Sequence, residues 1–330
     1  MEVKLLQNDE DKIEKIVNVL RNKNLFLITS HINLDGDGIG SEIALYLALK
    51  KLNKKVKIIN QDKIPYIFKF LPYSRIVEVF NEKKKVSNFE VAIIVDCGNL
   101  ERIGKMKEIV ENIPFLINID HHLSNFEFGD INWINPHFSS CGEMVYFLCD
   151  KLGKIDKKQA ICLYASILYD TCCFVHHLSL YTMDIVKYLL INKKIDAEKI
   201  AQKLFFERSI KSLNLFKLAL DTLKFDKNKK ICFMKVPKDF FKKVKAKEED
   251  TEGFVEFLVS IKGIEVGVLF KERENGVKVS MRSKGIVDVE NIARKFGGGG
   301  HREASGCFFE NKSIEEVESI IKKELKWTEY

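Results

Sequence analysis

The sequence is poor in the residues and runs that define several classes of protein. Its 330 residues include only 5 Pro and 18 Gly, which excludes collagen-like and low-complexity chains. No apolar run approaches the roughly 18 residues that cross a bilayer, and the acidic start does not resemble a signal peptide. The 8 Cys include no Cys-x-x-Cys pair, which disfavours a zinc ribbon and a disulfide framework. We therefore expect a cytoplasmic protein, and its length predicts two domains.

Arginine is also scarce, because only 8 of the 54 basic residues are Arg. The formal net charge is +7, but there is no block of like charge that would indicate a basic tail or an extended nucleic-acid groove. Four of the Arg fall within 30 residues: Arg273, Arg282, Arg294 and Arg302. An Arg guanidinium binds phosphate bidentately, so the cluster is compatible with a phosphate-binding region. Taken alone, chance clustering is the simpler explanation.

Short apolar runs separated by helical patterns predict an α/β fold with a parallel sheet in the first half of the chain. The expected strands are residues 25–29, 56–59, 91–95 and 115–119, and the expected helices are residues 9–23 and 39–52. Helical patterns then dominate from residue 141 to about residue 223.

A second, smaller α/β domain is predicted for the last third of the chain. Strand-like runs occur at residues 231–234, 264–270 and 277–281, followed by helical patterns at 288–296 and 313–325 on either side of a glycine run. We predict domains of residues 1–190 and 226–330, joined by a helical linker of residues 191–225.

Side chains that bind metals follow the predicted parallel strands. They are His31, Asp35 and Asp37 after the first strand, Asp96 after the third, and Asp120, His121 and His122 after the fourth. Asp170 ends a helical segment that could bring a further carboxylate to the same edge of the sheet. The carboxyl ends of parallel strands meet at one edge, where α/β proteins bind ligands.

These residue types match what a two-metal site needs. Two divalent ions about 3.5 to 4 Å apart, bridged by a carboxylate, clamp the attacking and leaving oxygens of phosphoryl transfer. Four aspartates, namely Asp35, Asp37, Asp96 and Asp170, would balance the charge of two such ions. Mixed imidazole and carboxylate ligands suit Mn²⁺, Fe²⁺ or Co²⁺ better than Mg²⁺.

The sequence resembles the DHH phosphoesterases at these positions. Residues 31–37, Asp96, residues 120–122 and residues 170–171 are similar to the four motifs of that family, and residues 296–306 resemble the glycine-rich motif of its DHH-associated domain. The resemblance implies an N-terminal catalytic DHH domain, a smaller substrate-binding domain and an active site in the cleft between them. It favours the NrnA-like group of nano-RNases and 3′-phosphoadenosine-5′-phosphate (pAp) phosphatases.

The resemblance also implies roles for individual residues. One metal would be held by His31, Asp35 and Asp96, and the other by Asp37, Asp96, His121 and Asp170. Asp96 would thus bridge the two metals and take part in catalysis together with His122, which is expected beside the scissile phosphate. Asp120 and Asn33 are expected to contact the ligand residues rather than the metals, and Asp120 is expected to orient an imidazole.

The glycine-rich segment is predicted to bind the substrate. Consecutive glycines let backbone N–H groups converge on an anion, and neighbouring side chains add further donors. The expected substrate-binding residues are Arg282, Gly298, Gly299, Gly300, His301 and Arg302. The alternative is a flexible loop after a helix that is capped at Gly297.

One motif departs from the family pattern. The fourth motif commonly reads Asp-Thr-Gly-x-Phe followed by Arg, whereas Cys172 stands here in place of the Gly and Val175 in place of the Arg. The metal ligand Asp170 is unaffected, but this side of the substrate pocket differs from the family pattern.

We predict a manganese-dependent phosphodiesterase and phosphatase that degrades very short oligoribonucleotides (nano-RNA) and acts on pAp. By resemblance, we also expect a homodimer that does not bind a membrane. Two alternatives stay open at this point. One is a soluble phosphodiesterase acting on cyclic di-AMP or its linear product pApA, and the other is a nucleotide-binding regulator that has lost catalysis.

Overall fold

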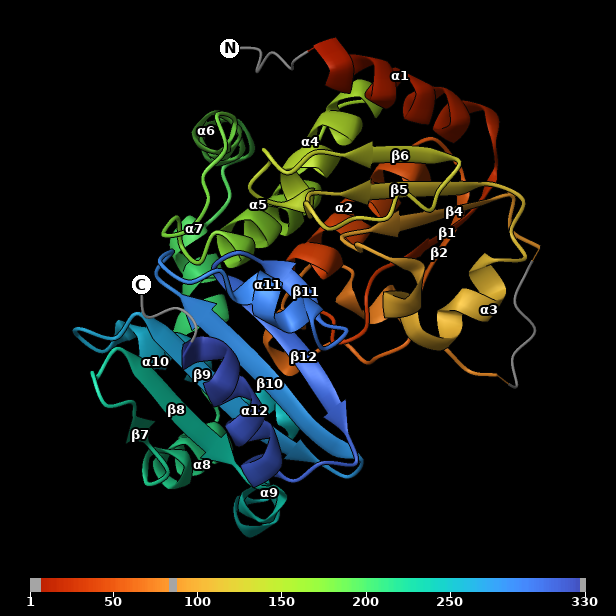
Figure 1. The fold of residues 1–330 in the computed structure, drawn as a ribbon. Helices are drawn as coiled ribbons and strands as arrows, with labels where there is room; N and C mark the ends of the chain where they lie inside the picture. The colour runs from red at the N-terminus through yellow and green to blue at the C-terminus, as the bar shows by residue number, and fades with distance from the viewer. Residues whose placement is uncertain (1–6, 83–87, 327–330) are drawn as a thin grey trace. The chain divides into compact units, whose positions relative to one another are not determined.

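A computed structural model describes residues 7–82 and 88–326 of the chain (Figure 1). The polypeptide divides into two units, residues 1–207 (unit 1) and residues 208–330 (unit 2). Each unit contains one six-stranded sheet covered by helices, which confirms the predicted α/β fold class. Residues 1–6 of the acidic start lie outside the described residues. None of the helices in the described ranges is both long enough and apolar enough to cross a membrane.

The sheet of unit 1 is parallel throughout, with strand order β3-β2-β1-β4-β5-β6. Its central strands are short runs of Val, Ile and Leu, as expected for strands that are buried on both faces. The strand order reverses between β1 and β4, and this is the point at which parallel sheets leave a crevice beyond their carboxyl ends. The strands are β1 (Leu25–Thr29), β2 (Lys55–Asn60), β3 (Glu78–Val79), β4 (Val91–Val95), β5 (Leu116–Asp120) and β6 (Ile131–Ile134).

Helices cover the two faces of this sheet unequally. The larger hydrophobic core joins one face to α1, α2, α4 and α5, and a smaller core packs η3 and α3 on the other face (Figure 1). The helical elements are α1 (Gln7–Asn22), α2 (Gly36–Lys51), η1 (Tyr66–Phe68), η2 (Ser74–Ile76), η3 (Leu100–Met106), α3 (Lys107–Val110), α4 (Cys141–Leu152), α5 (Lys157–Asp170), α6 (Thr182–Lys193), α7 (Ala197–Ala201) and the π-helical turn η4 (Gln202–Phe206).

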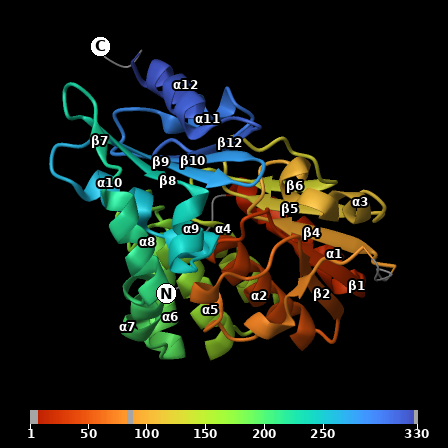
Figure 2. The same ribbon diagram turned by 90° about the horizontal axis from the view of Figure 1, so that it is seen from below.

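The sheet of unit 2 is mixed, with strand order β11-β12-β10-β9-β8-β7. Only β8 and β9 pair in parallel, and the other neighbours are antiparallel. One core lies between the sheet and α11 and α12, and another lies between the opposite face and α8 and α10 (Figure 2). The elements are α8 (Ile210–Leu220), β7 (Lys224–Phe225), β8 (Ile231–Val236), α9 (Lys238–Val244), η5 (Glu248–Thr251), α10 (Phe254–Ser260), β9 (Val266–Arg273), β10 (Gly276–Ser283), α11 (Val289–Arg294), β11 (Gly299–His301), β12 (Ala304–Glu310) and α12 (Ile314–Lys326).

Strand β12 was not predicted from the sequence, although it lies inside the sheet, between β11 and β10. Its buried side chains alternate as Ser305, Cys307 and Phe309, which is the strand period. Two of these three residues are small, and the glycine run just before them favours a loop interpretation. The pattern therefore carried too little hydrophobic contrast to identify the strand.

Candidate metal centre and active site

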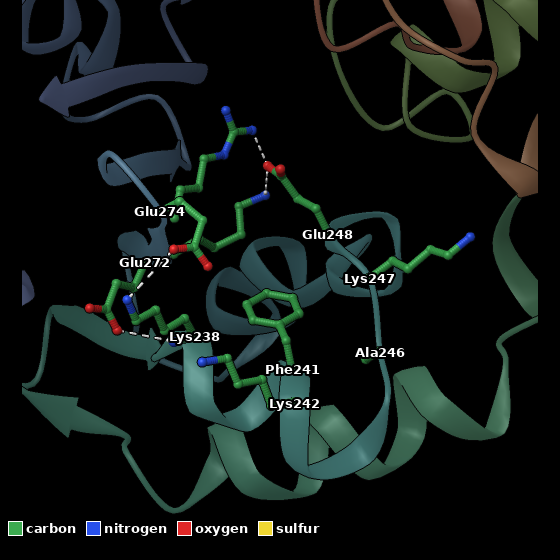
Figure 3. Close-up of a pocket in the computed structure, with 10 residues that line it drawn as sticks. Lys238, Phe241, Lys242, Ala246, Lys247, Glu248, Glu272 and Glu274 are labelled. Atoms are coloured by element: carbon green, nitrogen blue, oxygen red, sulfur yellow. Dashed lines mark hydrogen bonds and ion pairs between the residues drawn. The ribbon is translucent and has the colours of Figure 1, made fainter.

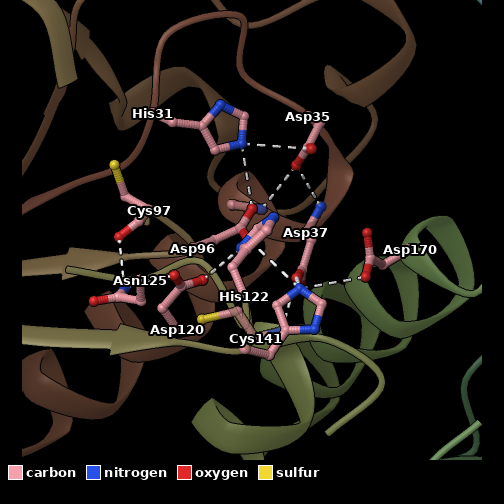
Figure 4. Close-up of polar contacts among 12 residues, drawn as sticks. His31, Asp35, Asp37, Asp96, Cys97, Asp120, His122, Asn125, Cys141 and Asp170 are labelled. Atoms are coloured by element: carbon pink, nitrogen blue, oxygen red, sulfur yellow. Dashed lines mark hydrogen bonds and ion pairs between the residues drawn. The ribbon is translucent and has the colours of Figure 1, made fainter. Parts of the chain in front are cut away.

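The carboxyl ends of three neighbouring strands and the ends of two helices bring the predicted metal ligands together (Figure 4). The loop after β1 carries His31 and Asp35, the first turn of α2 carries Asp37, and α5 ends at Asp170. Asp96 follows β4 directly, and His121 and His122 follow Asp120, the last residue of β5. All of these residues belong to unit 1.

His31 lies between two carboxylates. Its Nε2 atom is 3.5 Å from Asp35 Oδ2 and 3.3 Å from Asp96 Oδ2. Its other ring nitrogen, Nδ1, is 2.7 Å from the carbonyl oxygen of Ile32. Because a carbonyl oxygen only accepts, Nδ1 carries the donated proton and Nε2 is the atom directed at the carboxylates. Metal-binding histidines are typically held in this way.

His121 is held in the same manner in a second group. Its Nδ1 is 3.2 Å from the carbonyl oxygen of Phe138, and its Nε2 faces three carboxylates. The distances from Nε2 are 3.5 Å to Asp37 Oδ2, 3.8 Å to Asp96 Oδ1 and 3.4 Å to Asp170 Oδ2.

Asp96 belongs to both groups through different oxygens. Its Oδ2 faces His31, whereas its Oδ1 faces His121 and lies 3.6 Å from His122 Nδ1. The residue has a left-handed backbone with φ of 52°, which is uncommon outside glycine and typical of constrained functional positions. Its N–H bonds to the carbonyl of Ile119 at 2.9 Å, so the turn is anchored to the neighbouring strand.

Asp37 is fixed by the N-terminus of α4. The backbone N–H groups of Cys141 and Gly142 donate to its two carboxylate oxygens at 2.7 and 3.0 Å, and the Ser166 hydroxyl donates to Oδ1. The positive end of the helix dipole favours a carboxylate there. Ser166 was not predicted as a site residue, although it lies one helical turn before Asp170 and therefore on the same face of α5.

Asp120 orients His122, as expected. Asp120 Oδ1 is 2.7 Å from His122 Nδ1, and its Oδ2 accepts a hydrogen bond of 2.6 Å from the side-chain amide of Asn125. Asp120 is fully buried, and burial alone would raise its pKa, but His122, together with His121 and Asn125, lowers the pKa to about 2. Asn125 was missed by the sequence analysis, although it follows Asp120 by only five residues.

The crowded carboxylates perturb one another strongly. Burial, followed by the charges of Asp96 and Asp170, raises the pKa of Asp37 well above its usual range. Burial also raises the pKa of Asp170 to about 7. Burial opposes protonation of both imidazoles, but the surrounding carboxylates raise the pKa of His31 to about 10 and that of His121 to about 9. The electrostatics of the cluster thus favour bound positive charge.

The residues present fit divalent cations on the chemistry of their donors. Ligand atoms of His31, Asp35 and Asp96 lie within 4.8 Å of one another, and so do those of Asp37, Asp96 and His121. Each group offers one imidazole nitrogen and two carboxylates, a set that suits Mn²⁺ or Fe²⁺.

The chain after Asp170 forms an unusual turn. Cys172, Cys173 and Phe174 have φ values of 47°, 57° and 66°, all in the left-handed region. Cys172 therefore has a conformation that suits the glycine commonly found at this position in the family. Val175 is 72% exposed and leaves this side of the site without the guanidinium of the usual Arg.

Asn33 does not join either group of ligands. It is exposed, has a φ of 60°, and its backbone N–H bonds to Asp62 Oδ2 at 2.6 Å. Its supporting role stays a prediction.

In unit 2, the predicted substrate-binding residues gather near the glycine segment. Arg282 of β10 and His301 of β11 both pair with Ala304 of β12, from opposite sides, so the three residues form one row across the sheet. Directly paired antiparallel residues point to the same face, and the central one is small. Arg282 forms an ion pair of 2.8 Å with Glu256. Arg302 is exposed just after β11.

The glycine run is a helix cap followed by a strand. The N–H groups of Gly297 and Gly298 bond to the carbonyls of Arg294 and Ala293, which ends α11 as a Schellman motif. Gly299 and Gly300 then belong to β11. Gly300 has a φ of 140°, and a Cβ atom there would collide with the backbone carbonyl of Ala304. The segment is thus an ordered edge strand rather than a flexible loop.

Comparison with known proteins agrees with this geometry. Residues 25–168 match the DHH family, N-terminal domain, and residues 228–328 match the DHHA1 domain. The chain is 30% identical over 305 residues to the bifunctional oligoribonuclease and PAP phosphatase NrnA of Thermus thermophilus, covering 90% of this chain and 89% of that relative. The chain belongs to the DHH family. This DHH-family protein is therefore an enzyme, a hydrolase of phosphoester bonds, as predicted.

Other relatives extend the similarity. The chain is 28% identical over 289 residues to the bifunctional oligoribonuclease and PAP phosphatase NrnA of Bacillus subtilis, covering 85% of this chain and 88% of that relative. The crystal structure of an exopolyphosphatase-related protein from Bacteroides fragilis superposes with a TM-score of 0.87 at 29% identity, covering 96% of both chains. RecJ from Thermus thermophilus, solved in complex with Mn²⁺, shares the fold with a TM-score of 0.53 at 13% identity, covering 96% of this chain and 54% of RecJ.

Proposed function

We propose that this DHH-family enzyme is a manganese-dependent phosphodiesterase and phosphatase that degrades very short oligoribonucleotides and dephosphorylates pAp. The substrate class is supported by the NrnA relatives, which are named as oligoribonucleases and PAP phosphatases. Their similarity extends over 90% and 85% of this chain. One observation supports two-metal catalysis most directly: Asp96 directs Oδ2 at His31 and Oδ1 at His121, so one carboxylate belongs to both groups of ligands. A regulator without catalysis would have no need for two complete groups of ligands that share one carboxylate.

In this proposal two divalent ions are held in unit 1. His31, Asp35 and Asp96 would hold one ion, and Asp37, Asp96, His121 and Asp170 would hold the other. When bound, such a pair neutralises charge on the phosphate and lowers the pKa of water toward neutrality. The N-terminus of α4 holds the Asp37 carboxyl group in place through two backbone N–H groups.

His122 acts on the substrate through Nε2. Asp120 accepts the Nδ1 proton at 2.7 Å and thereby fixes both the tautomer and the ring orientation. The Nε2 atom then contacts the scissile phosphate, where it stabilises developing charge or assists the leaving oxygen. Asn125 completes the support by holding the other oxygen of Asp120.

Unit 2 binds the terminal phosphate of the substrate. Arg282 and His301 flank the small Ala304 on one face of the sheet, so two donors for the terminal phosphate lie on either side of a short side chain. A substrate anchored at its end in this way is limited to a few nucleotides, since a long strand needs an extended basic groove. Arg282→Ala or His301→Ala should therefore raise KM for 5′-phosphorylated nucleotides without changing the metal content.

The substrate preference is tested by measuring kcat/KM with Mn²⁺ on pAp, a 5-mer RNA, pApA and cyclic di-AMP in parallel. We expect pAp and the 5-mer RNA to be hydrolysed at least tenfold more efficiently than cyclic di-AMP. A kcat/KM that is highest on cyclic di-AMP or pApA would overturn the proposed substrate class and favour a soluble dinucleotide phosphodiesterase. Turnover of none of the four would overturn the proposed function.

A further inference from the structure

Unit 2 contains a cavity of about 340 Å³ that the proposed function does not use (Figure 3). Its wall is formed by α9, the segment between α9 and η5, and the end of β9. The volume lies in the range of small-molecule binding sites, roughly 300 to 1,000 Å³. Five of the ten lining residues are Lys or Arg and three are Glu, so the lining carries an excess of positive charge.

Three cations converge on the carboxylate of Glu248, and two of them, Lys271 and Arg273, line the cavity together with Glu248. Oxygen Oε1 of Glu248 is 3.7 Å from Lys271 Nζ and 3.9 Å from Lys278 Nζ, and it also forms an ion pair with Arg273 Nη2. Lys271 and Lys278 pair directly across β9 and β10, so their side chains lie on the same face of the sheet. The guanidinium of Arg273 lies 5.8 Å from the ring centroid of Phe308, which limits its movement.

Glu248 is the carboxylate that pairs with all three cations, and Glu252 and Glu256 add negative charge around Lys271 from farther away. The side chain of Lys271 is 11% exposed and that of Lys278 is 24% exposed, so both ammonium groups have lost much of their contact with water. Burial, followed by the charge of Lys271, lowers the pKa of Lys278 to about 7. Glu248 is the most exposed member of the cluster, at 42%, and lies on the short helix η5. Its side chain can therefore turn out into water. A doubly charged anion in its place would balance the cluster better than a single carboxylate does.

The cavity also offers a surface for a flat apolar group. The ring of Phe241 lines it below Glu248 (Figure 3). An aromatic ring beside clustered cations is the combination that stacks a base while the cations bind the phosphate.

This cluster is separate from the row that contains Arg282. Lys278 and Arg282 lie four residues apart on the same face of β10, which corresponds to roughly 13 Å along the strand. The cluster of Lys271, Arg273 and Lys278 and the single cation of Arg282 therefore lie apart on this face of the sheet. Each is neutralised in part by a carboxylate of the adjoining helical segment, namely Glu248 for this cluster and Glu256 for Arg282.

We propose that Lys271, Arg273 and Lys278 form a second nucleotide-binding site, in which a phosphate monoester displaces Glu248 and the base stacks on Phe241. Its ligand class is a mononucleotide or the phosphorylated end of a short oligonucleotide. Glu248 holds the cations together in the absence of the ligand and competes with it for them.

Binding of 5′-AMP, adenosine and inorganic phosphate to the full-length protein, measured by calorimetry in EDTA, tests this site. We expect Arg273→Gln to weaken AMP binding about tenfold, because a charge-assisted contact to phosphate is lost. Glu248→Gln removes the competitor and should strengthen AMP binding severalfold. Lys295→Gln, which breaks an exposed ion pair with Glu324 elsewhere in unit 2, is the matched control and should leave the Kd within twofold.

The opposite signs of the two variants separate a binding site from a structural ion cluster. If Arg273→Gln and Glu248→Gln weaken AMP binding together, or if neither changes it, the proposal is wrong. Adenosine should bind at least tenfold more weakly than AMP, and inorganic phosphate should compete with AMP. If inorganic phosphate competes with AMP but the two have the same Kd, the base adds nothing to binding, and the stacking role of Phe241 is wrong. Because no turnover occurs in EDTA, a failure of the proposed hydrolysis would leave these outcomes intact.

Discussion

Glu42 links α2 to the end of β1, the strand that leads to His31, and its ionisation should limit stability. The residue is fully buried in α2. The side-chain amide of Asn60 donates to Glu42 Oε2 at 2.8 Å, and its oxygen Oδ1 accepts from the hydroxyl of Thr29 and the N–H of Ser30 at 3.1 and 3.0 Å. Burial raises the pKa of Glu42 from 4.5 to about 8, against the smaller opposing effect of the Asn60 hydrogen bond.

The raised pKa makes the stabilising contribution of Glu42 depend on pH. The folded protein binds the proton more tightly than the unfolded chain, so this contribution is complete below pH 4.5 and is lost as the pH rises toward about 8. At 1.36 kcal/mol per pKa unit, the loss amounts to roughly 3 kcal/mol at pH 7. Glu42→Gln keeps the shape and the acceptor for Asn60 but does not ionise.

Urea unfolding in EDTA at several pH values measures this effect. The free energy of unfolding of Glu42→Gln, relative to wild type, should rise by roughly 3 kcal/mol between pH 5 and pH 8. Glu10→Gln, which removes an exposed carboxylate of α1, is the matched control and should change stability by less than about 0.5 kcal/mol at either pH. A difference between Glu42→Gln and wild type that stays constant with pH would refute the reasoning.

Three further substitutions test other parts of the structure. Asp120→Asn removes the negative charge beside His122 and leaves one oxygen where His122 and Asn125 now use two, so kcat should fall roughly 10- to 100-fold while metal binding, measured by elemental analysis, is retained. Cys172→Gly relieves a left-handed backbone and should stabilise the protein by about 0.5 kcal/mol in urea unfolding, whereas Cys162→Gly inside α5 should destabilise it. Gly300→Ala inserts a Cβ against backbone and should lower the free energy of unfolding of unit 2 by roughly 1 to 3 kcal/mol, as monitored by thermal denaturation.

The positions of the candidate site residues that follow strands could be predicted because their signals are local. Asp96 and Asp120 each follow a run of buried apolar residues, so the same few residues identify both the strand and its carboxyl end. The rule that parallel strands end at one edge then brings these side chains together without further information. The glycine run is also a local signal, and it predicts a substrate-binding segment. The sequence did not predict that part of this run forms the edge strand β11.

The supporting residues could not be predicted in this way because their contacts span the chain. Asp37 is held by backbone N–H groups of Cys141 and Gly142, more than 100 residues away. Almost every residue has such a group, so the sequence does not show which ones bind Asp37. Asn125 and Ser166 are common residue types whose importance depends on where the fold directs them. Glu42 lies among apolar residues of a helix, and only its burial reveals that its charge is costly.

The central claim is that Asp96 joins two metal sites, and the most direct test is to count the bound Mn²⁺ and measure hydrolysis in Asp96→Asn. Asn tolerates the left-handed backbone at this position, so the substitution removes charge without forcing a different turn. The account predicts fewer bound Mn²⁺ ions per chain than in wild type. It also predicts a loss of pAp and 5-mer RNA hydrolysis of roughly a hundredfold or more, which exceeds the loss expected for a supporting partner. Full Mn²⁺ binding with undiminished hydrolysis in this variant would contradict the account.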